Sequence, residues 1–293
     1  MVAARGALAI CVRRHSNVSK KPEFIAQQVL AHGSAEPIVA RTVLQTSELV
    51  QAFPVSEKRR EALKQIAHDT MLRLLAAKDA YNHVATQLAE AQARVASQGL
   101  DVQAEGRFVS LPAILNLQAD AENFLREVKL ALAQIALVFT PFYKTKFDHR
   151  FQKIQSWALK TFGEGDELTK LLRSDADWID RVIRMRNAVE HPGGRNGALI
   201  IRNIGLDTVA PPALTPPGWG FEGKALHPML PEMDAILHNA LTLFDDVLCA
   251  CLDKRQPQGP LSIIEIPEEQ RDPTMPIRFR VTIQLPDLKR NNA

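Results

Sequence analysis

Residues 186–191, with the sequence RNAVEH, hold the side chains in this chain that are best suited to chemistry. Arg186 can bind two phosphate oxygens through its planar guanidinium and stabilise the charge that develops on them in a transition state. His191 can transfer a proton near neutral pH. Asn187 can orient the imidazole or bind the phosphate, since it lies four residues before His191 on a helix. Together these side chains fit attack on a phosphodiester, and this set requires no metal ligand.

The spacing of these residues needs a break in the helix that carries them. Arg186 and His191 would lie about 140° apart on a regular helix, because each residue turns it by about 100°. Pro192 follows directly, and a proline disfavours helical backbone at the residue before it. We therefore expect His191 to leave the helix and turn toward Arg186 and Asn187. Nearby arginines are candidate RNA-binding residues: Arg181, Arg184 and Arg195.

This arrangement resembles the HEPN family (higher eukaryotes and prokaryotes nucleotide-binding domains), in particular its ribonuclease branch. The motif of that branch is Arg, four to six residues and His, often with a polar residue after the Arg. Arg186, Asn187 and His191 match it with four intervening residues, and Arg184 also lies at a permitted spacing. The resemblance implies an up-and-down helical bundle that pairs its motifs across a homodimer. The composite site would cleave RNA through the RNA 2′-hydroxyl, without a metal or a cofactor.

The resemblance further implies RNA as a partner, a toxin or antiviral defence role, and a possible antitoxin or regulatory partner. By sequence it covers the motif alone, and as an architecture it covers residues 57–253. Two other interpretations use the same residues. In a non-catalytic helical scaffold, assembled through the long helix at 57–98 and the β tail, Arg186 pairs with an acidic residue such as Asp180 or Glu190, which lies four residues on, and His191 caps the last carbonyls of the helix. In a binding module, the cleft holds a nucleotide or RNA without cutting it.

Residues 57–98 are predicted to form one long helix. Their apolar positions recur at alternating spacings of four and three, and Ser56 and Gly99 suit its two ends. At about 1.5 Å per residue it would reach roughly 60 Å, which is longer than a compact bundle needs. Part of it is therefore expected to project or to pair with another chain.

Further helices are predicted along the chain. One begins at Ser110 and Pro112 and ends at Pro141, with residues 130–139 apolar all round. Another buries Phe151, Ile154, Trp157 and Ala158 and ends at Gly163. A helical turn at residues 166–173 is followed by a capping box, Ser174 with Asp177, that opens the helix of the motif. The last helix opens at Pro231.

Residues 198–204 and 277–285 are predicted strands, and residues 262–266 can pair with the latter. Residues 207–228 are predicted to form a long loop rich in proline and glycine. The predicted fold is mainly α, an up-and-down bundle with a small β appendage formed by the mid-chain strand and the C-terminal strands. We expect an N-terminal appendage at 1–56, the bundle at 57–260 with an insertion at 207–228, and a β tail at 261–293 packed on the bundle.

Composition favours a protein of the cytoplasm. The formal net charge is only +3 over 293 residues, so any basic surface must come from local clustering. Cys11, Cys249 and Cys251 suit neither a disulfide framework nor a zinc site. The apolar run at 130–139 is shorter than the roughly 20 residues that span a bilayer, so we expect no membrane. Residues 1–15 are basic and favour a disordered leader over an organelle presequence.

Overall fold

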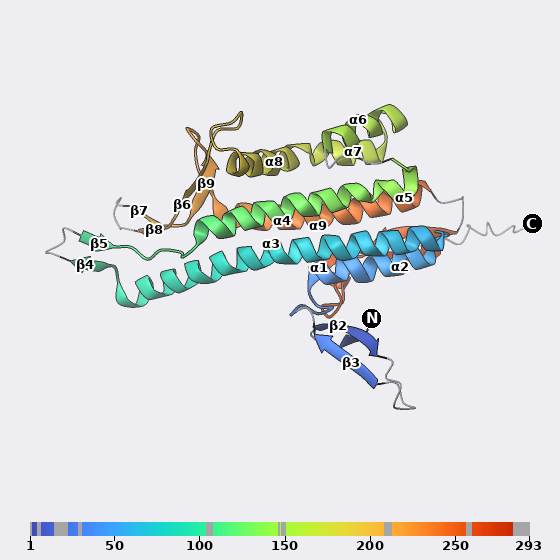
Figure 1. Ribbon diagram of the computed structural model, residues 1–293, viewed down its shortest axis with the longest axis horizontal. Coiled ribbons are helices and arrows are strands. Elements are labelled where there is room, and N and C mark those ends of the chain that lie inside the picture. The colour runs from blue at the N-terminus through green and yellow to red at the C-terminus, as the bar shows by residue number, and fades with distance from the viewer. Residues whose placement is uncertain are drawn as a thin grey trace, which may run out of the picture. The chain divides into compact units, whose positions relative to one another are not determined.

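The computed structural model describes residues 2–4, 7–14, 23–28, 31–103, 108–145, 147, 151–207, 213–255 and 260–283. It is mainly helical, with 64% helix and small antiparallel sheets (Figure 1). This confirms the predicted fold class. The chain folds into two compact units: unit 1 comprises Met1–Met71, Leu137–Lys146 and Phe244–Ala293, and unit 2 comprises Leu72–Ala136 and Phe147–Leu243. The domain boundaries at 56 and 260 stay predictions.

Unit 1 combines the two ends of the chain. Its helical part contains α1 (Pro37–Val39), a π-helical turn (Ala40–Leu44), α2 (Gln45–Ala52), the start of α3 (Glu57–Gln98), α5 (Phe139–Tyr143) and the end of α9 (Met229–Lys254). Its strands are β1 (Val2–Ala4), β2 (Ala7–Arg14) and β3 (Glu23–Gln28), which form one antiparallel sheet, and the hairpin β11 (Leu261–Glu265) and β12 (Phe279–Ile283), with a 3-10 turn at Glu268–Gln270. The N-terminal sheet was not predicted, and the expectation of a disordered leader at residues 1–15 is wrong where β1 and β2 lie.

Unit 2 contains the rest of α3, α4 (Leu117–Leu137), α6 (Phe151–Phe162), α7 (Glu167–Ser174), α8 (Ala176–Glu190) and the start of α9. Its strands are β4 (Asp101–Gln103), β5 (Phe108–Ser110), β6 (Leu199–Arg202), β7 (Gly205–Asp207), β8 (Ala213–Thr215), β9 (Gly218–Phe221) and β10 (His227–Pro228). Helices α3 and α4 lie side by side and antiparallel (Figure 1), since Arg73 pairs with Glu127 and His83 with Asp120.

The long helix α3 confirms the prediction from apolar spacing. It runs over Glu57–Gln98, and the carbonyl of Ser56 accepts the N–H of Arg60 at 2.9 Å. Gly99 ends it with a φ of 77°, a left-handed conformation that glycine adopts without steric cost. Buried side chains at spacings of three and four line its inner face, with the half-buried Tyr81 between Ala77 and Val84: Leu63, Ala67, Thr70, Leu74, Ala77, Val84, Leu88 and Ala91.

Helix α4 begins later than predicted. It starts at Leu117, whereas Ser110 belongs to strand β5. Asn116, at a φ of 59°, precedes the helix, and its carbonyl accepts the N–H of Asp120 at 3.0 Å. Helix α4 ends at Leu137, four residues before Pro141, because a proline has no N–H to donate to the carbonyl there. Pro141 instead lies inside α5, which was not expected as a separate helix.

The predicted capping box before α8 is wrong. Ser174 is the last residue of α7, and its hydroxyl donates to the carbonyl of Leu171 at 2.8 Å. Since Ser174 is still helical, it cannot take the extended backbone of an N-cap. The side chain that does cap is Asp166, whose carboxylate accepts the N–H of Leu168 at 3.0 Å at the start of α7. Helix α6 buries Phe151, Ile154 and Ala158 as predicted, whereas Trp157 is only half-buried.

The predicted loop at 207–228 is wrong in part, because it contains strands β8, β9 and β10; its residues 208–212 lie outside the described part of the chain. Strand β9 is central to a sheet of order β10-β9-β6, and its Trp219 is fully buried. A Cβ on Gly220 would lie 2.9 Å from the carbonyl oxygen of Ala225, so only glycine fits this close approach.

The mid-chain strand and the C-terminal strands form separate sheets, not one appendage. Strand β6 pairs with β9, whereas β11 and β12 pair with each other, from Leu261 opposite Ile283 to Glu265 opposite Phe279. The pairing of the two C-terminal strands confirms the prediction. Residues 284 and 285 of the predicted strand lie outside the described residues.

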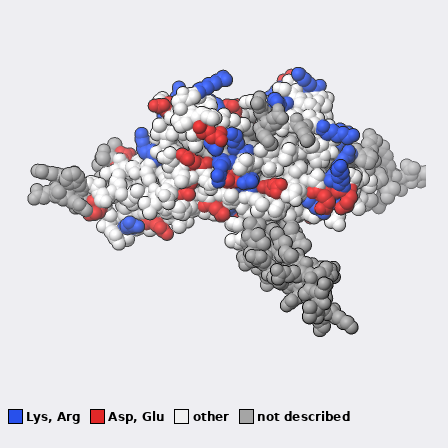
Figure 2. All heavy atoms as spheres, viewed as in Figure 1, with Lys and Arg blue, Asp and Glu red and all other residues white. Residues whose placement is uncertain are grey.

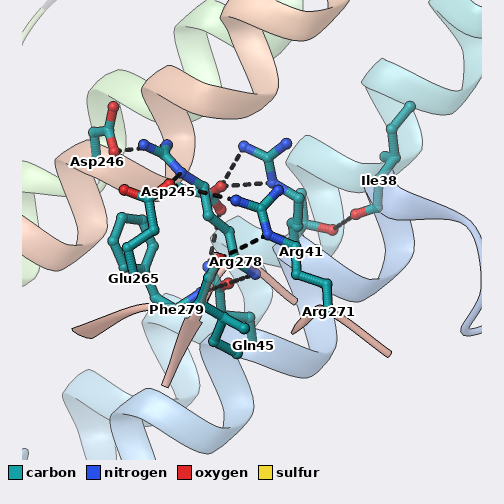
Figure 3. Close-up of polar contacts among 11 residues, drawn as sticks. Ile38, Arg41, Gln45, Asp245, Asp246, Glu265, Arg271, Arg278 and Phe279 are labelled. Atoms are coloured by element: carbon teal, nitrogen blue, oxygen red, sulfur yellow. Dashed lines mark hydrogen bonds and ion pairs between the residues drawn. The ribbon is translucent and has the colours of Figure 1, made fainter. Parts of the chain in front are cut away.

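A buried polar network joins the segments of unit 1 (Figure 3). Asp245 of α9 is fully buried, and its Oδ2 accepts from Nε of Arg41 at 2.7 Å. Its Oδ1 accepts from the amide of Gln45 at 2.9 Å. Burial raises the pKa of Asp245 to about 7, although the Arg41 guanidinium acts to lower it.

The same network holds the C-terminal hairpin. The amide oxygen of Gln45 accepts the backbone N–H groups of Arg278 and Phe279, each at 2.7 Å. The Arg278 guanidinium then binds Asp246 and Glu265, each at 2.8 Å. The first helices, α9 and the hairpin are therefore fixed to one another by side chains that are far apart in the sequence.

Helix α9 is long and apolar enough, by length and composition alone, to cross a bilayer. However, 61% of its apolar stretch is buried inside the protein. A buried core helix has the same composition, so this feature alone is weak support for a membrane span.

Candidate functional site

Three helices of unit 2 enclose a groove beside the end of α8. Its volume is about 780 Å³. Helix α4 contributes cations and apolar side chains to it, α6 contributes Gln152, and α8 contributes the first two motif residues, Arg186 and Asn187. The apolar part of the lining includes Leu130, Ala133 and Ile183, and the charged part includes Lys129 and Glu190. The groove thus offers both an apolar wall and cations to a ligand.

Arg186 lies one turn before the end of α8 and is mostly buried, with 14% of its side chain exposed. Its Nη2 contacts Oε1 of Glu190 at 2.7 Å. Its Nε is buried and has no acceptor among the residues that the structure describes. The pairing with Glu190 is one of the two that the scaffold interpretation expects, and Asp180 pairs with Arg184 instead.

Glu190 also bonds to α4, where Nζ of Lys129 donates to its Oε2 at 3.2 Å. Burial acts to raise the pKa of Glu190, but the hydrogen bond and charge of Lys129, with the charges of Arg186 and His191, lower it below its usual value. Glu190 is therefore an ionised carboxylate at neutral pH, shared between cations from two helices.

His191 leaves the helix, as Pro192 requires. It follows the last residue of α8 with φ −135° and ψ 69°, and its N–H still donates to the carbonyl of Asn187 at 2.9 Å. Its side chain is exposed, and of the described residues it is not among those that line the groove. The imidazole and the Arg186 guanidinium nevertheless both act on the carboxylate of Glu190. Within one chain, the two side chains therefore do not line the same groove.

The other arginines near the motif point to different partners. The Arg181 guanidinium binds both carboxylate oxygens of Glu232, and Trp219 donates to the same carboxylate at 2.7 Å. Arg184 pairs with Asp180 at 2.8 Å. None of these side chains lines the groove among the described residues, so Arg186, and not Arg184, is the motif arginine that faces it.

Arg184 also lies 5.5 Å from the centre of the Phe221 ring, so its guanidinium covers an aromatic face. Arg195 is exposed, in the turn beyond α8, and has no ion pair among the described residues. The face in Figure 2 shows cations and anions interspersed over the described residues, without a broad basic area. Any RNA-binding surface there would be local.

Among the described residues, no three His, Cys, Asp or Glu side chains are grouped so that they could hold a metal ion. Cys249 and Cys251 of α9 are thiols whose pKa burial raises above the usual value, so neither is an activated nucleophile.

Lys129 and the position of Glu190 between two cations are the parts of the site that sequence reasoning missed. Lys129 lies 61 residues before Glu190, and nothing in its local sequence distinguishes it from other helical lysines. Comparison with known family models, curated proteins and solved structures finds no match for this chain. The geometry of the groove and the motif therefore carry the functional argument.

Proposed function

We propose that this chain is an endoribonuclease of HEPN type that cleaves RNA without a metal ion. The observation that carries the proposal is that Arg186 and Asn187, the first two motif residues, line a groove that Arg126 and Lys129 also line. The exposed His191 directly follows the same helix. RNA is the partner that this chemistry fits, and a toxin or antiviral defence role, with an antitoxin or regulatory partner in the cytoplasm, is part of the proposal.

The proposed reaction uses the RNA itself as nucleophile. The ribose 2′-oxygen bonds to the adjacent phosphorus as the bond from phosphorus to O5′ breaks, and the 2′-hydroxyl proton leaves to water. Arg186 holds the non-bridging oxygens and stabilises their developing charge. His191 gives its proton to the departing O5′. The products are a 2′,3′-cyclic phosphate and a 5′-hydroxyl.

A homodimer would complete the site. His191 is exposed and stands outside the groove of its own chain, so in the proposal the imidazole meets a phosphate that lies between two copies. An exposed histidine at the end of a helix is accessible to a second copy. This supports a composite site over a site within one chain.

The test is cleavage of single-stranded RNA by purified protein in the presence of a chelator. Wild type should cleave, and Arg186→Ala and His191→Ala should each abolish cleavage. Arg173→Ala is the matched control, because Arg173 is an exposed arginine of α7 whose partner is Glu164. Equal cleavage by wild type and both motif variants would refute the proposal.

The position of His191 also favours a second candidate, a module that binds RNA or a nucleotide without cutting it. A groove lined by Arg186 and Asn187 but not by the histidine has the means to hold a phosphate and lacks the group that protonates the leaving oxygen. Tight RNA binding by wild type with no turnover, reduced by Arg186→Ala and unchanged by His191→Ala, would select this candidate.

A further inference from the structure

The groove already holds an anion, because Glu190 lies between two of its cations. Its two oxygens are shared between Nη2 of Arg186, at 2.7 Å, and Nζ of Lys129, at 3.2 Å. All three side chains line the groove. Two cations therefore face one internal carboxylate, which leaves one positive charge uncompensated.

The Arg186 guanidinium is only partly used by this carboxylate. Nε and Nη2 lie on the same edge of a guanidinium, and this edge is the one that binds two oxygens of a carboxylate or phosphate at once. In unit 2 the Arg181 guanidinium binds both oxygens of Glu232 in this way. At Arg186, Nη2 bonds to Glu190 while the buried Nε has no acceptor among the described residues. One of the two donors on this edge of Arg186 is therefore unused within the part of the chain that the structure describes.

We propose that Lys129 and Arg186 form one phosphate subsite of the groove, and that Glu190 fills it as an internal anion until an RNA phosphate displaces it. A phosphate oxygen pair can use both donors of the Arg186 edge, whereas Glu190 uses one. The displaced carboxylate can turn to solvent, since 36% of the Glu190 side chain is already exposed. The identification of the ligand as RNA rests on the proposed function.

Lys129, and not Arg126, is the cation of α4 that belongs to the subsite, because the two residues have different partners. Arg126 also lines the groove, but its Nη2 donates to Asn123 at 2.6 Å and pairs with Glu127 at 3.0 Å. Displacing Glu190 leaves these contacts of Arg126 in place, whereas it breaks the ion pair of Lys129 with Glu190. Lys129 thus gains the most from a phosphate.

The apolar wall suits the rest of a nucleotide. Leu130 follows Lys129 on α4 and has 37% of its surface exposed, and Ala133 and Ile183 line the same groove. A base can pack on these side chains while its phosphate lies on Lys129 and Arg186, since the groove of about 780 Å³ has room for a ligand of that size. The subsite therefore fits a nucleotide unit of an RNA strand better than a free inorganic anion.

The experiment measures binding of a fluorescent, fully 2′-O-methylated RNA, which has no free 2′-hydroxyl and so is not cleaved. Lys129→Met should weaken binding about fivefold or more and lower the slope of log Kd against log salt by about 1. Glu190→Gln should tighten binding about threefold or more, because the internal competitor is neutral. Lys129→Arg should restore the wild-type salt slope.

The matched controls are Lys170→Met and Glu167→Gln, which break an exposed pair of α7 that joins Nζ to Oε1 at 2.7 Å. They should bind RNA as wild type does. Binding by Lys129→Met and Glu190→Gln that equals wild type would overturn the proposal even if wild type cleaves RNA in the separate assay. Opposite shifts in the two variants would support the subsite even if no cleavage occurs.

Discussion

Replacing Arg41 with methionine would leave Asp245 without its counter-ion at a fully buried site. The carboxylate of Asp245 accepts hydrogen bonds from Nε of Arg41 at 2.7 Å and from the amide of Gln45 at 2.9 Å (Figure 3). None of the surface of Asp245 is exposed. Methionine keeps much of the volume and removes the charge. The main loss is therefore electrostatic, since the buried carboxylate then keeps the neutral amide of Gln45 as its hydrogen-bond donor and feels Arg278 only through its charge.

The expected magnitude follows from this burial. Breaking a buried ion pair by removing one partner costs about 3–5 kcal/mol of the free energy of unfolding. The loss should depend on pH, because the pKa of Asp245 is raised to about 7 by burial and Arg41 acts to lower it. Without Arg41 the folded pKa rises further.

The sign of the pH effect is fixed by the folded and unfolded states. A carboxyl with a raised folded pKa binds its proton more tightly when folded, so this stability is present at low pH and is lost as pH rises through the folded pKa. In wild type the stability linked to Asp245 is lost by about pH 7, which is the folded pKa of this residue. In Arg41→Met the folded pKa is higher, so the free energy of unfolding continues to fall above pH 7. Since one pH unit is worth about 1.4 kcal/mol, the difference between the two proteins should be about 2 kcal/mol larger at pH 8.5 than at pH 5.5.

The assay is urea unfolding followed by circular dichroism at the two pH values. Lys64→Met is the control, because Lys64 pairs with Glu61 at an exposed position on α3, and its loss should cost about 0.2–1 kcal/mol at both pH values. A loss below about 1 kcal/mol for Arg41→Met at pH 8.5, or an equal loss at the two pH values, would refute the electrostatic reasoning.

Two further predictions concern unit 2. Arg181→Ala should lower the free energy of unfolding by about 1.5–3 kcal/mol, because Glu232 loses charged hydrogen bonds in a partly buried site, and urea unfolding measures this. Arg186→Ala mixed with His191→Ala should recover RNA cleavage that neither variant shows alone, because a mixed dimer has one composite site with both groups intact. If the two variants are unfolded and refolded together and RNA cleavage does not recover, then Arg186 and His191 act within one chain.

Local patterns were enough to predict the long helices. The bounds of α3 follow from apolar spacing and from Gly99, whose positive φ ends the helix. The prediction of a capping box at Ser174 was wrong because the same residue types can end one helix or begin the next. Only the packing of α7 decides between these two outcomes. Strand β9 was missed because its glycines, which suggest a loop, are required by the close approach of the chain near Ala225.

Tertiary partners account for what the sequence did not reveal about the sites. Lys129 meets Glu190 across 61 residues, and Arg41 meets Asp245 across 204. No local pattern encodes such pairs, because they depend on how the helices pack. The motif at Arg186 and His191 could be identified from residue types and spacing, whereas its placement beside a groove with an internal anion needed the structure.

The chemistry of the products tests the nuclease proposal most directly. Wild type in excess chelator, given an RNA with one 2′-deoxy position, should produce 2′,3′-cyclic phosphate and 5′-hydroxyl ends at every site except that one, and His191→Ala should produce none. Cleavage at the 2′-deoxy position, 3′-hydroxyl ends, or the same products from His191→Ala would contradict a mechanism in which the RNA attacks itself and His191 protonates the leaving oxygen.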